Sequence, residues 1–334
     1  MTAASAPGKI ILCGEYAVLD GEPAVVMAVD RRAVARLADD PQPLSAFLRA
    51  AVDEVRRGFG SRSAEADAIA RALIDTSALK QDGDKLGLGS SAAATVAAIA
   101  RSLAAAGVTS LGVREKAQIL LLASAAHAAA QRGIGGDEGS GADVFAAVAG
   151  GVHEYRNPRT PTGHGHGHWH GQIPLSRWLT LPVGFTWVAV WTGQTADTRN
   201  LVAAVRAYRD RDPGGYAEHI APVAGASRAF IAACKPAGAD CVAAVAAIAS
   251  GGAAIAALGA AAGVLLETDA VRHIAATARA AGGAAKPTGA GGGDTVVAAF
   301  ADPSQASQFR DNLRGDGIDA LDLSVEMDGV RLHP

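Results

Sequence analysis

The feature that most constrains the fold is a cluster of glycines and serines directly before a long alanine-rich segment. Residues 84–107 read DKLGLGSSAAATVAAIARSLAAAG. Large apolar residues recur in it at helical spacing: Val96, Ile99 and Leu103. This periodicity predicts a helix, and Ser90 and Ser91 stand where an N-cap is expected. A helix start stripped of side chains can bind an anion, most often phosphate, although an ordinary capped helix after a flexible turn fits the same residues.

The composition narrows the class of protein. The chain has 334 residues, enough for one large domain or two of ordinary size, and its formal net charge is −3. This charge argues against a nucleic acid as an electrostatic partner. Cys13, Cys234 and Cys241 are too few and too scattered for a disulfide scaffold. We find no apolar run of membrane-spanning length and no signal-peptide pattern, so we expect a soluble, cytoplasmic protein without a membrane partner.

Strand-like and helical segments alternate along the chain, which predicts a layered α/β or α+β enzyme fold. The expected strands lie within 9–37, 70–79, 152–155 and 185–193, and the expected helices within 44–57, 90–107, 114–133 and from 142. Further helices are expected up to about residue 266. The polar segment 157–174 has no periodicity and is interpreted as a surface loop. We therefore expect two domains, residues 1–178 and 179–334.

Glycines cluster at three places in the chain, at 87–89, 135–141 and 289–293. In one α/β protein, such clusters indicate close approaches of the backbone to a ligand. The first cluster also fits G-x-G-x-x-A through Gly87, Gly89 and Ala92, which is typical of dinucleotide sites. The acidic residue expected about 20 positions later is missing, and the chain has no P-loop pattern. A nicotinamide-dependent dehydrogenase stays open as a distant alternative.

Three segments together resemble the motifs of the GHMP kinases, the superfamily of galactose, homoserine, mevalonate and phosphomevalonate kinases. They are APGKIILCGEYAVLDGEPAV at 6–25, KLGLGSSAAATVA at 85–97 and KPTGAGGGDTVVAAF at 286–300, in the family's order. Within the superfamily, Tyr16 and the placement of Lys85 directly before the loop look most like the phosphomevalonate kinases. The resemblance implies a two-domain α+β fold. Its N-terminal domain would be of the ribosomal protein S5 domain 2 type, and its C-terminal domain ferredoxin-like.

The resemblance also implies an activity and a set of site residues. The expected reaction transfers a phosphoryl group from ATP, with Mg²⁺, to phosphomevalonate; mevalonate or another small alcohol is the alternative acceptor. A further alternative is a GHMP-fold sensor, which would bind ligand without turnover. We expect the protein to be a monomer or homodimer. The implied ATP-binding residues are Lys85, Gly87, Leu88, Gly89, Ser90, Ser91 and Ala92, with Ser91 as a tentative Mg²⁺ ligand. The implied substrate-binding residues are Lys9, Lys85, Ser140, Gly141, Asp143, Thr198, Arg199 and Gly291.

Lys9 and Asp143 match the family's catalytic pair. Phosphoryl transfer needs alignment and neutralisation of charge more than covalent help. Two opposite charges about 4 Å apart interact by about 4 kcal/mol at an effective dielectric constant of 20, which would keep Asp143 ionised. A doubly charged acceptor phosphate needs an additional cation, and Lys85 is the best candidate. For Lys9 and Asp143 the alternative is a structural ion pair, and for Lys85 it is a solvated surface lysine.

Some features depart from the family pattern. Mevalonate kinases carry a Mg²⁺-binding glutamate on the helix before the SGxD loop, whereas here Gln131 lies nearest the expected place and Asp137 or Glu138 are other candidates. Alternating histidines at 164–170 suggest a metal site, but flexible glycines between them favour a solvated loop. Trp187 and Trp191 alternate like strand residues, which predicts core positions.

Overall fold

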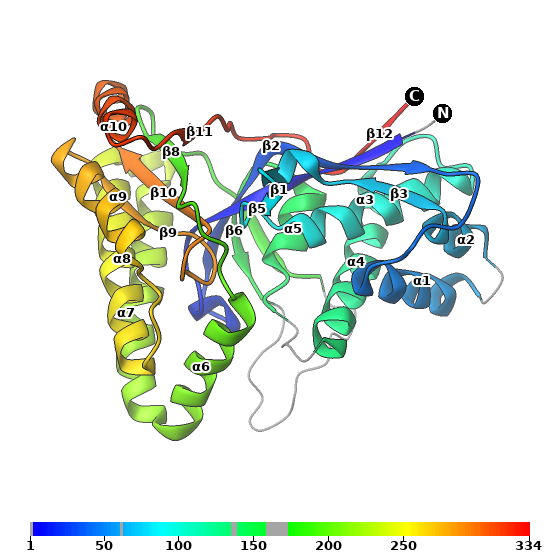
Figure 1. Ribbon diagram of the computed structural model, residues 1–334, viewed down its shortest axis with the longest axis horizontal. Coiled ribbons are helices and arrows are strands. Elements are labelled where there is room, and N and C mark those ends of the chain that lie inside the picture. The colour runs from blue at the N-terminus through cyan, green and yellow to red at the C-terminus, as the bar shows by residue number, and fades with distance from the viewer. Residues whose placement is uncertain (1–2, 61–62, 135–138, 158–172) are drawn as a thin grey trace.

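Two antiparallel β-sheets organise the molecule, and they lie side by side (Figure 1). The structure, a computed structural model, describes residues 3–60, 63–134, 139–157 and 173–334. The first sheet has the order β12–β1–β2–β6–β7, and β3 also pairs with β2. Its strands are β1 (Ala3–Cys13), β2 (Ala24–Leu37), β3 (Ala72–Asp75), β6 (Val152–Arg156), β7 (Leu175–Trp178) and β12 (Arg331–His333). The long β2 spans the sheet because its first residues pair with β6 and its last residues pair with β3.

Helices from the first half of the chain cover this sheet. They are α1 (Ala46–Phe59), α2 (Ala64–Ala70), α3 (Ser90–Ala105), α4 (Val113–Gly133) and α5 (Ala142–Ala149), with 3-10 turns η1 (Ala17–Asp20) and η2 (Ser77–Leu79). The alanine-rich α3 packs on β1 and β2, because small side chains allow close contact between helix and sheet. A small hairpin of β4 (Lys80–Gln81) and β5 (Asp84–Lys85) precedes α3. The bounds of α1, α3, α4 and α5 match the predicted helices within a few residues, whereas α2 was not predicted.

The serines expected to cap α3 do not do so. The N-cap position is Gly89, whose φ of 76° is left-handed, and the helix begins at Ser90 without a side-chain capping bond. A left-handed φ favours glycine because other residues meet steric strain there. Neither serine hydroxyl is therefore used to cap the helix.

The second sheet confirms the ferredoxin-like expectation. It has the order β11–β8–β10–β9, formed by β8 (Thr186–Trp191), β9 (Ala284–Pro287), β10 (Thr295–Phe300) and β11 (Ala320–Leu321). In chain order the neighbours are the fourth, first, third and second strands, with α9 (Asp269–Ala280) before β9 and α10 (Pro303–Gly315) after β10. This is the β-α-β-β-α-β arrangement. Helices α6 (Thr198–Arg211), α7 (Pro213–Ala233) and α8 (Cys241–Ala262), with η3 (Pro236–Gly238), come between β8 and α9.

Both faces of the second sheet are covered, which explains the unbroken apolar run TVVAAF in β10. Val296 and Phe300 face a core that contains Ile274 of α9 and Phe309 of α10. The intervening Val297 contributes to the other core cluster, together with residues of α7 and α8. Strand side chains alternate between faces, so a strand buried on both sides is apolar throughout. Trp187 and Trp191 pack against the core, as predicted.

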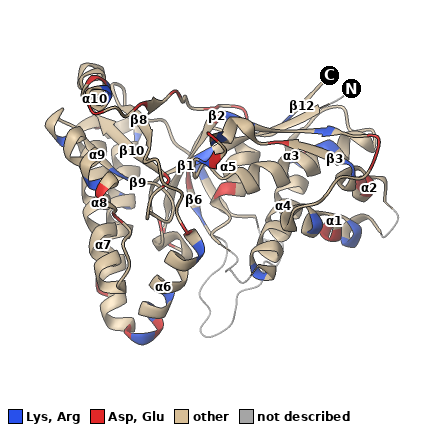
Figure 2. Ribbon diagram, in the orientation of Figure 1, with Lys and Arg blue, Asp and Glu red and all other residues tan. Residues whose placement is uncertain are grey.

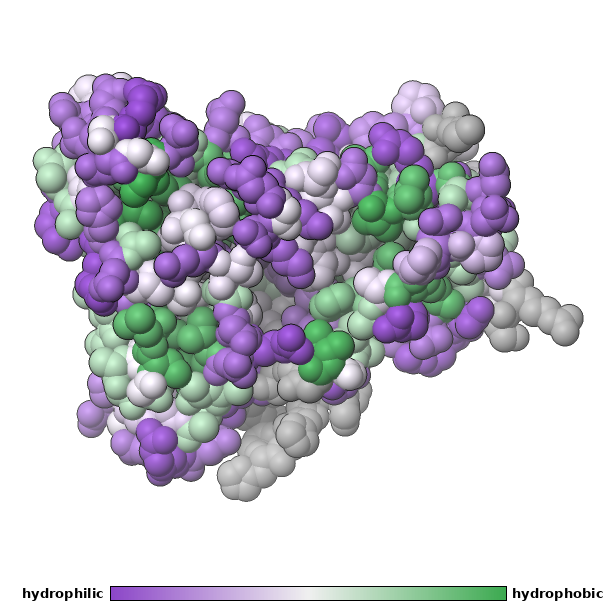
Figure 3. Space-filling view, viewed as in Figure 1, coloured by the Kyte–Doolittle hydropathy of each residue, from purple (hydrophilic) through white to green (hydrophobic). Residues whose placement is uncertain are grey.

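The expectation that the chain contains no apolar run of membrane-spanning length is wrong for α8. This 22-residue helix is long and apolar enough to cross a membrane by length and composition, because it contains alanine, glycine and branched residues but no charged residue. In the structure it packs against α7 and β9, and 44% of an apolar 18-residue stretch of this helix is buried. On the face shown in Figure 3, hydrophobic residues form separate patches surrounded by hydrophilic ones. A helix that packs within a protein can have the same length and apolar composition, and α8 packs in this way on α7 and β9.

Charged residues of both signs are interspersed over the two halves in the view of Figure 2, and no single-signed stripe stands out there. The C-terminal segment returns to the first sheet, where β12 pairs with β1 and Val325 bridges to Val29 of β2. We propose to keep the domain boundary at residues 178 and 179, with this returning segment attached to the first domain.

Candidate active site

A cavity of about 820 Å³ lies between the two halves of the molecule. Its walls come from β1, the glycine loop before α3, the starts of α5 and α6, and residues 288–294 after β9. Ten of the residues expected at the site line it: Lys9, Lys85, Gly87, Gly89, Ser90, Ser91, Ser140, Asp143, Thr198 and Arg199. The three motifs, far apart in the sequence, therefore converge on one space.

Four expected site residues do not line the cavity. The side chains of Leu88 and Ala92 are buried in the core, so only their backbone is left for a ligand. Gly141 caps the start of α5 behind the cavity wall. Gly291 packs against the backbone of Leu266, where an added Cβ would lie 2.6 Å from its carbonyl oxygen. Sequence position alone does not separate residues that hold a loop in place from residues that face the space beside it.

The glycine loop is fixed by its neighbours on both sides. The backbone N–H of Lys9 donates to the Leu88 carbonyl at 2.9 Å, and the Thr295 hydroxyl donates to the Leu86 carbonyl at 2.7 Å. Burial of the leucines turns Gly87 and Gly89 toward the cavity, both with left-handed φ, 73° and 76°. Backbone N–H groups at the start of α3 can thus face an anion without obstruction.

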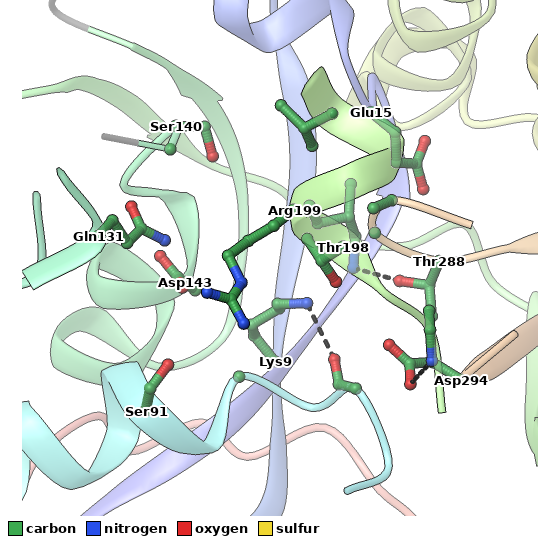
Figure 4. A pocket seen from close by; sticks show the side chains of 18 of the residues that line it. Lys9, Glu15, Ser91, Gln131, Ser140, Asp143, Thr198, Arg199, Thr288 and Asp294 are labelled. Atoms are coloured by element: carbon green, nitrogen blue, oxygen red, sulfur yellow. Dashed lines mark hydrogen bonds between the residues drawn. The ribbon is translucent and has the colours of Figure 1, made fainter. Parts of the chain in front are cut away.

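Lys9 stands on β1 at the centre of the cavity wall, where its Nζ donates to the Gly87 carbonyl at 3.1 Å (Figure 4). Burial lowers its pKa, and the carboxylates of Asp143, Asp294 and Glu15 oppose that shift. The structural ion pair with Asp143, which was the alternative interpretation, is not formed: among the described residues, no carboxylate oxygen lies within 4.0 Å of Nζ. The physical reason is that the Gly87 carbonyl takes the ammonium. Lys9 and Asp143 nevertheless flank one point, since both lie within 3.6 Å of the Cβ position of Gly89.

Asp143 lies in the first turn of α5, where the positive end of the helix dipole favours a carboxylate. Its Oδ1 accepts from the backbone N–H of Val144 at 2.9 Å, and Oδ2 lies 3.7 Å from Nε2 of His127. The preceding turn is held by the Tyr155 hydroxyl, which donates to the Ser140 carbonyl at 2.6 Å. The carboxylate is thus held at the cavity while part of it stays open to a ligand.

Asp294 is a site residue that the sequence analysis did not single out. It has a left-handed φ of 49°, and its Oδ1 accepts from the backbone N–H of Ala196 at 3.0 Å. Burial raises the pKa of Asp294, while that N–H and the cations of Lys9 and Lys85 oppose the shift. An Asp after three glycines was the available signal, but only the fold shows that its side chain lies against Gly87.

Glu15 and Lys286 form a buried ion pair that the sequence analysis also missed. Lys286 Nζ donates to Glu15 Oε1 and to the Pro287 carbonyl, and both side chains are at most 1% exposed. Burial raises the pKa of Glu15, and Lys286 opposes this. A neighbouring bond runs from the Ile11 N–H to the Thr288 hydroxyl at 3.0 Å. These contacts join the first motif to the third beneath the cavity.

The rim carries two further cations. Arg199, at the start of α6, extends toward Asp143 and Lys9 (Figure 4), and its Nη1 donates to the Ile134 carbonyl at the end of α4. That bond, 3.1 Å long, connects the two halves across the cavity. Lys85 is exposed on β5 and contributes to the electrostatic field at Asp294. An anionic ligand would therefore meet Lys9, Lys85 and Arg199 from different sides.

The fit of a divalent cation rests on few groups. In the described part of the chain, no group of three or more His, Cys, Asp and Glu side chains is placed to hold a metal. Ser91 and Asp143 both face the cavity and offer oxygen donors, which suit Mg²⁺ when substrate phosphates and water complete its shell. Asp137, Glu138 and the histidines at 164–170 lie outside the described residues. Gln131 lines the cavity but carries no charge.

Comparison with known proteins identifies the fold. The family model described as GHMP kinases C terminal matches residues 257–319. The chain has the GHMP kinase fold, with its mixed helices and sheets in two domains. The dehydrogenase alternative is wrong on the fold: every strand pairing described is antiparallel, whereas the dinucleotide fingerprint belongs to a parallel βαβ unit.

Individual relatives narrow the comparison. Phosphomevalonate kinase of Streptomyces sp. (strain CL190) is 28% identical over 382 aligned residues, which cover 97% of each chain. The structure of Streptococcus pneumoniae phosphomevalonate kinase, in complex with phosphomevalonate and AMPPNP, matches with a TM-score of 0.76 at 17% identity, over 97% of this chain and all of that one. Mevalonate kinase of L. major, in complex with R-mevalonate, matches with a TM-score of 0.67 at 18% identity, over 98% and 94%.

Proposed function

We propose that this chain is a phosphomevalonate kinase, which transfers the γ-phosphoryl group of ATP to 5-phosphomevalonate and yields 5-diphosphomevalonate and ADP. The observation that carries the proposal is the full-length similarity to a phosphomevalonate kinase, combined with three cations around one cavity. The acceptor brings a carboxylate and a phosphate, and an unpaired anion in a half-buried site is costly. We expect the enzyme to work in the cytoplasm, as a monomer or homodimer.

The start of α3 is the proposed seat of the ATP phosphates. The free N–H groups of Gly87 to Ala92 would donate to phosphate oxygens, with the hydroxyls of Ser90 and Ser91 beside them. When bound, Mg²⁺ would neutralise charge on the transferring phosphates, and Ser91 and Asp143 are the described side chains placed to hold it.

Lys9 and Asp143 are the proposed catalytic residues. An acceptor oxygen attacks the γ-phosphorus, the bond from that phosphorus to the bridging oxygen of ADP breaks, and the electron pair of that bond leaves with ADP. Asp143 would orient the attacking oxygen and accept its proton when the acceptor carries one, while Lys9 would stabilise negative charge near Gly89. Ser140, Thr198, Arg199 and Lys85 would bind the acceptor from the rim.

An acceptor-panel assay tests the proposal. Purified protein with ATP and Mg²⁺ is given phosphomevalonate, mevalonate, homoserine or no acceptor, and ADP release is measured. Phosphomevalonate should give the highest kcat/KM, and Asp143→Asn should reduce turnover by at least a hundredfold without lowering the melting temperature. A higher kcat/KM for mevalonate would assign the chain to the alternative acceptor. Nucleotide binding without ADP release from any acceptor would favour a sensor.

A further inference from the structure

A largely buried histidine, His127, lines the cavity beside the proposed phosphate-binding and catalytic residues. Nε2 of His127, on α4, is 3.2 Å from Oγ of Ser91 and 3.7 Å from Oδ2 of Asp143. One ring nitrogen thus faces both the start of α3 and the start of α5. His127 belongs to none of the three motifs and stands alone in an alanine-rich helix.

The imidazole ring has little freedom to move. Its side chain is 4% exposed, and the ring packs against Phe47 of α1 with centroids 4.8 Å apart and planes tilted by 32°. A ring held in this way fixes the direction of Nε2, which is the condition for positioning other groups.

The surroundings select the tautomer. A lone pair on Nε2 would face the Asp143 carboxylate, which repels it, so Nε2 carries the proton and donates to Oγ of Ser91. The Ser91 hydroxyl then keeps its own hydrogen and one lone pair for the cavity. In this state it can donate to a phosphate oxygen and still offer an oxygen to a cation.

We propose that His127 is a positioning residue, which holds the Ser91 hydroxyl toward a nucleoside triphosphate and keeps it in register with Asp143. The inference rests on the proposed function for the identity of the reaction. It adds a residue on α4 as the link between the phosphate loop and the catalytic carboxylate. His127 touches neither substrate nor metal in this scheme and acts through Ser91 and Asp143.

Two polar substitutions separate positioning from packing. In His127→Gln the side-chain amide can reach the place of Nε2, whereas in His127→Asn it reaches only the place of Nδ1. The affinity for a non-hydrolysable ATP analogue, measured by calorimetry, and kcat should fall about tenfold in the Asn variant and stay within about threefold in the Gln variant. The KM for the acceptor should change less than kcat, because Ser91 acts on the transferring phosphate and the rim residues proposed to bind the acceptor are unchanged.

His153 supplies the matched control. It is also a buried histidine against a phenylalanine, 5.1 Å from the ring of Phe145, but it does not line the cavity. His153→Gln and His153→Asn should leave kcat and nucleotide affinity within twofold of the wild type. Equal kcat and equal affinity in the Gln and Asn variants of His127 would overturn the proposal.

A double-mutant cycle gives a second measurement should the Asn variant fail to fold. His127→Leu fills the space beside Phe47, and combined with Ser91→Ala it should be no worse than the worse single variant, because each removes the same bond. Losses that multiply would refute the link. Analogue affinity does not depend on the acceptor: if the wild type ignores phosphomevalonate, the proposed function fails while the affinity series still decides the role of His127.

Discussion

Replacing Gly87 with alanine tests the convergence of the loop before α3 with the loop after β9. The new Cβ would lie 2.7 Å from Cβ and 2.8 Å from Oδ2 of Asp294, well inside the 3.5–4.0 Å that carbon atoms prefer. The left-handed φ of 73° adds about 1–2 kcal/mol of strain. To make room, Asp294 must move and weaken its bond with the Ala196 N–H, which costs about 2 kcal/mol more because the acceptor is a carboxylate.

Gly83→Ala is the control for this variant. Gly83 also has a left-handed φ, 92°, in the turn between β4 and β5, but no atom lies within 4 Å of its Cβ position. Both variants should lose stability from backbone strain, and only Gly87→Ala should also lose about 2 kcal/mol at the site, or about 30-fold in affinity for an ATP analogue. Calorimetric titration and thermal melting measure the two effects. If both variants bind the analogue equally well, Asp294 does not constrain the loop and the reasoning fails.

Further predictions concern the charges around the cavity. Burial lowers the pKa of Lys9 from 10.5, so activity that needs its cation should decline with rising pH before an exposed lysine would titrate. In the pH profile of kcat/KM, Lys9→Arg should move the alkaline limb to higher pH. Alkaline limbs that coincide in the wild type and the variant would contradict this. Lys85→Met should raise the KM for phosphomevalonate about tenfold and the KM for mevalonate less. Lys80 is the exposed partner of Lys85 across the β4–β5 hairpin and does not line the cavity, so Lys80→Met should change neither KM. Glu15→Gln should lower the free energy of unfolding by about 3–5 kcal/mol, because it leaves Lys286 buried without its partner. The double variant Glu15→Gln with Lys286→Met should recover part of this loss. A double variant that melts no higher than Glu15→Gln alone would count against the pair.

Much of the fold follows from periodicity and motif order. The spacing of Val96, Ile99 and Leu103 predicted α3, and the strand expected within 185–193 is β8. The ferredoxin-like order of the second sheet came from the family resemblance, because strand order depends on contacts between distant segments. Residue spacing carries no such information.

The candidate site divides in the same way. Lys9, Ser91 and Asp143 stand in motifs, and the sequence indicated them; whether they fill their predicted roles stays a proposal. His127 and Asp294 gain their importance from neighbours 36 and 98 positions away, so no local pattern marks them. Gly291 is the opposite case: its motif position predicted a substrate contact, but it packs its loop against Leu266 and does not line the cavity.

The return of the C-terminal segment to the first sheet has a mechanical consequence. The chain passes between the two sheets once between β7 and β8 and again between β11 and β12. Together with the core that α7 and α8 share with β1 and β2, these two covalent crossings hold the lobes against separation. Opening or closing of the cavity between the lobes would therefore load the Arg199 bond to Ile134, which joins the start of α6 to the end of α4.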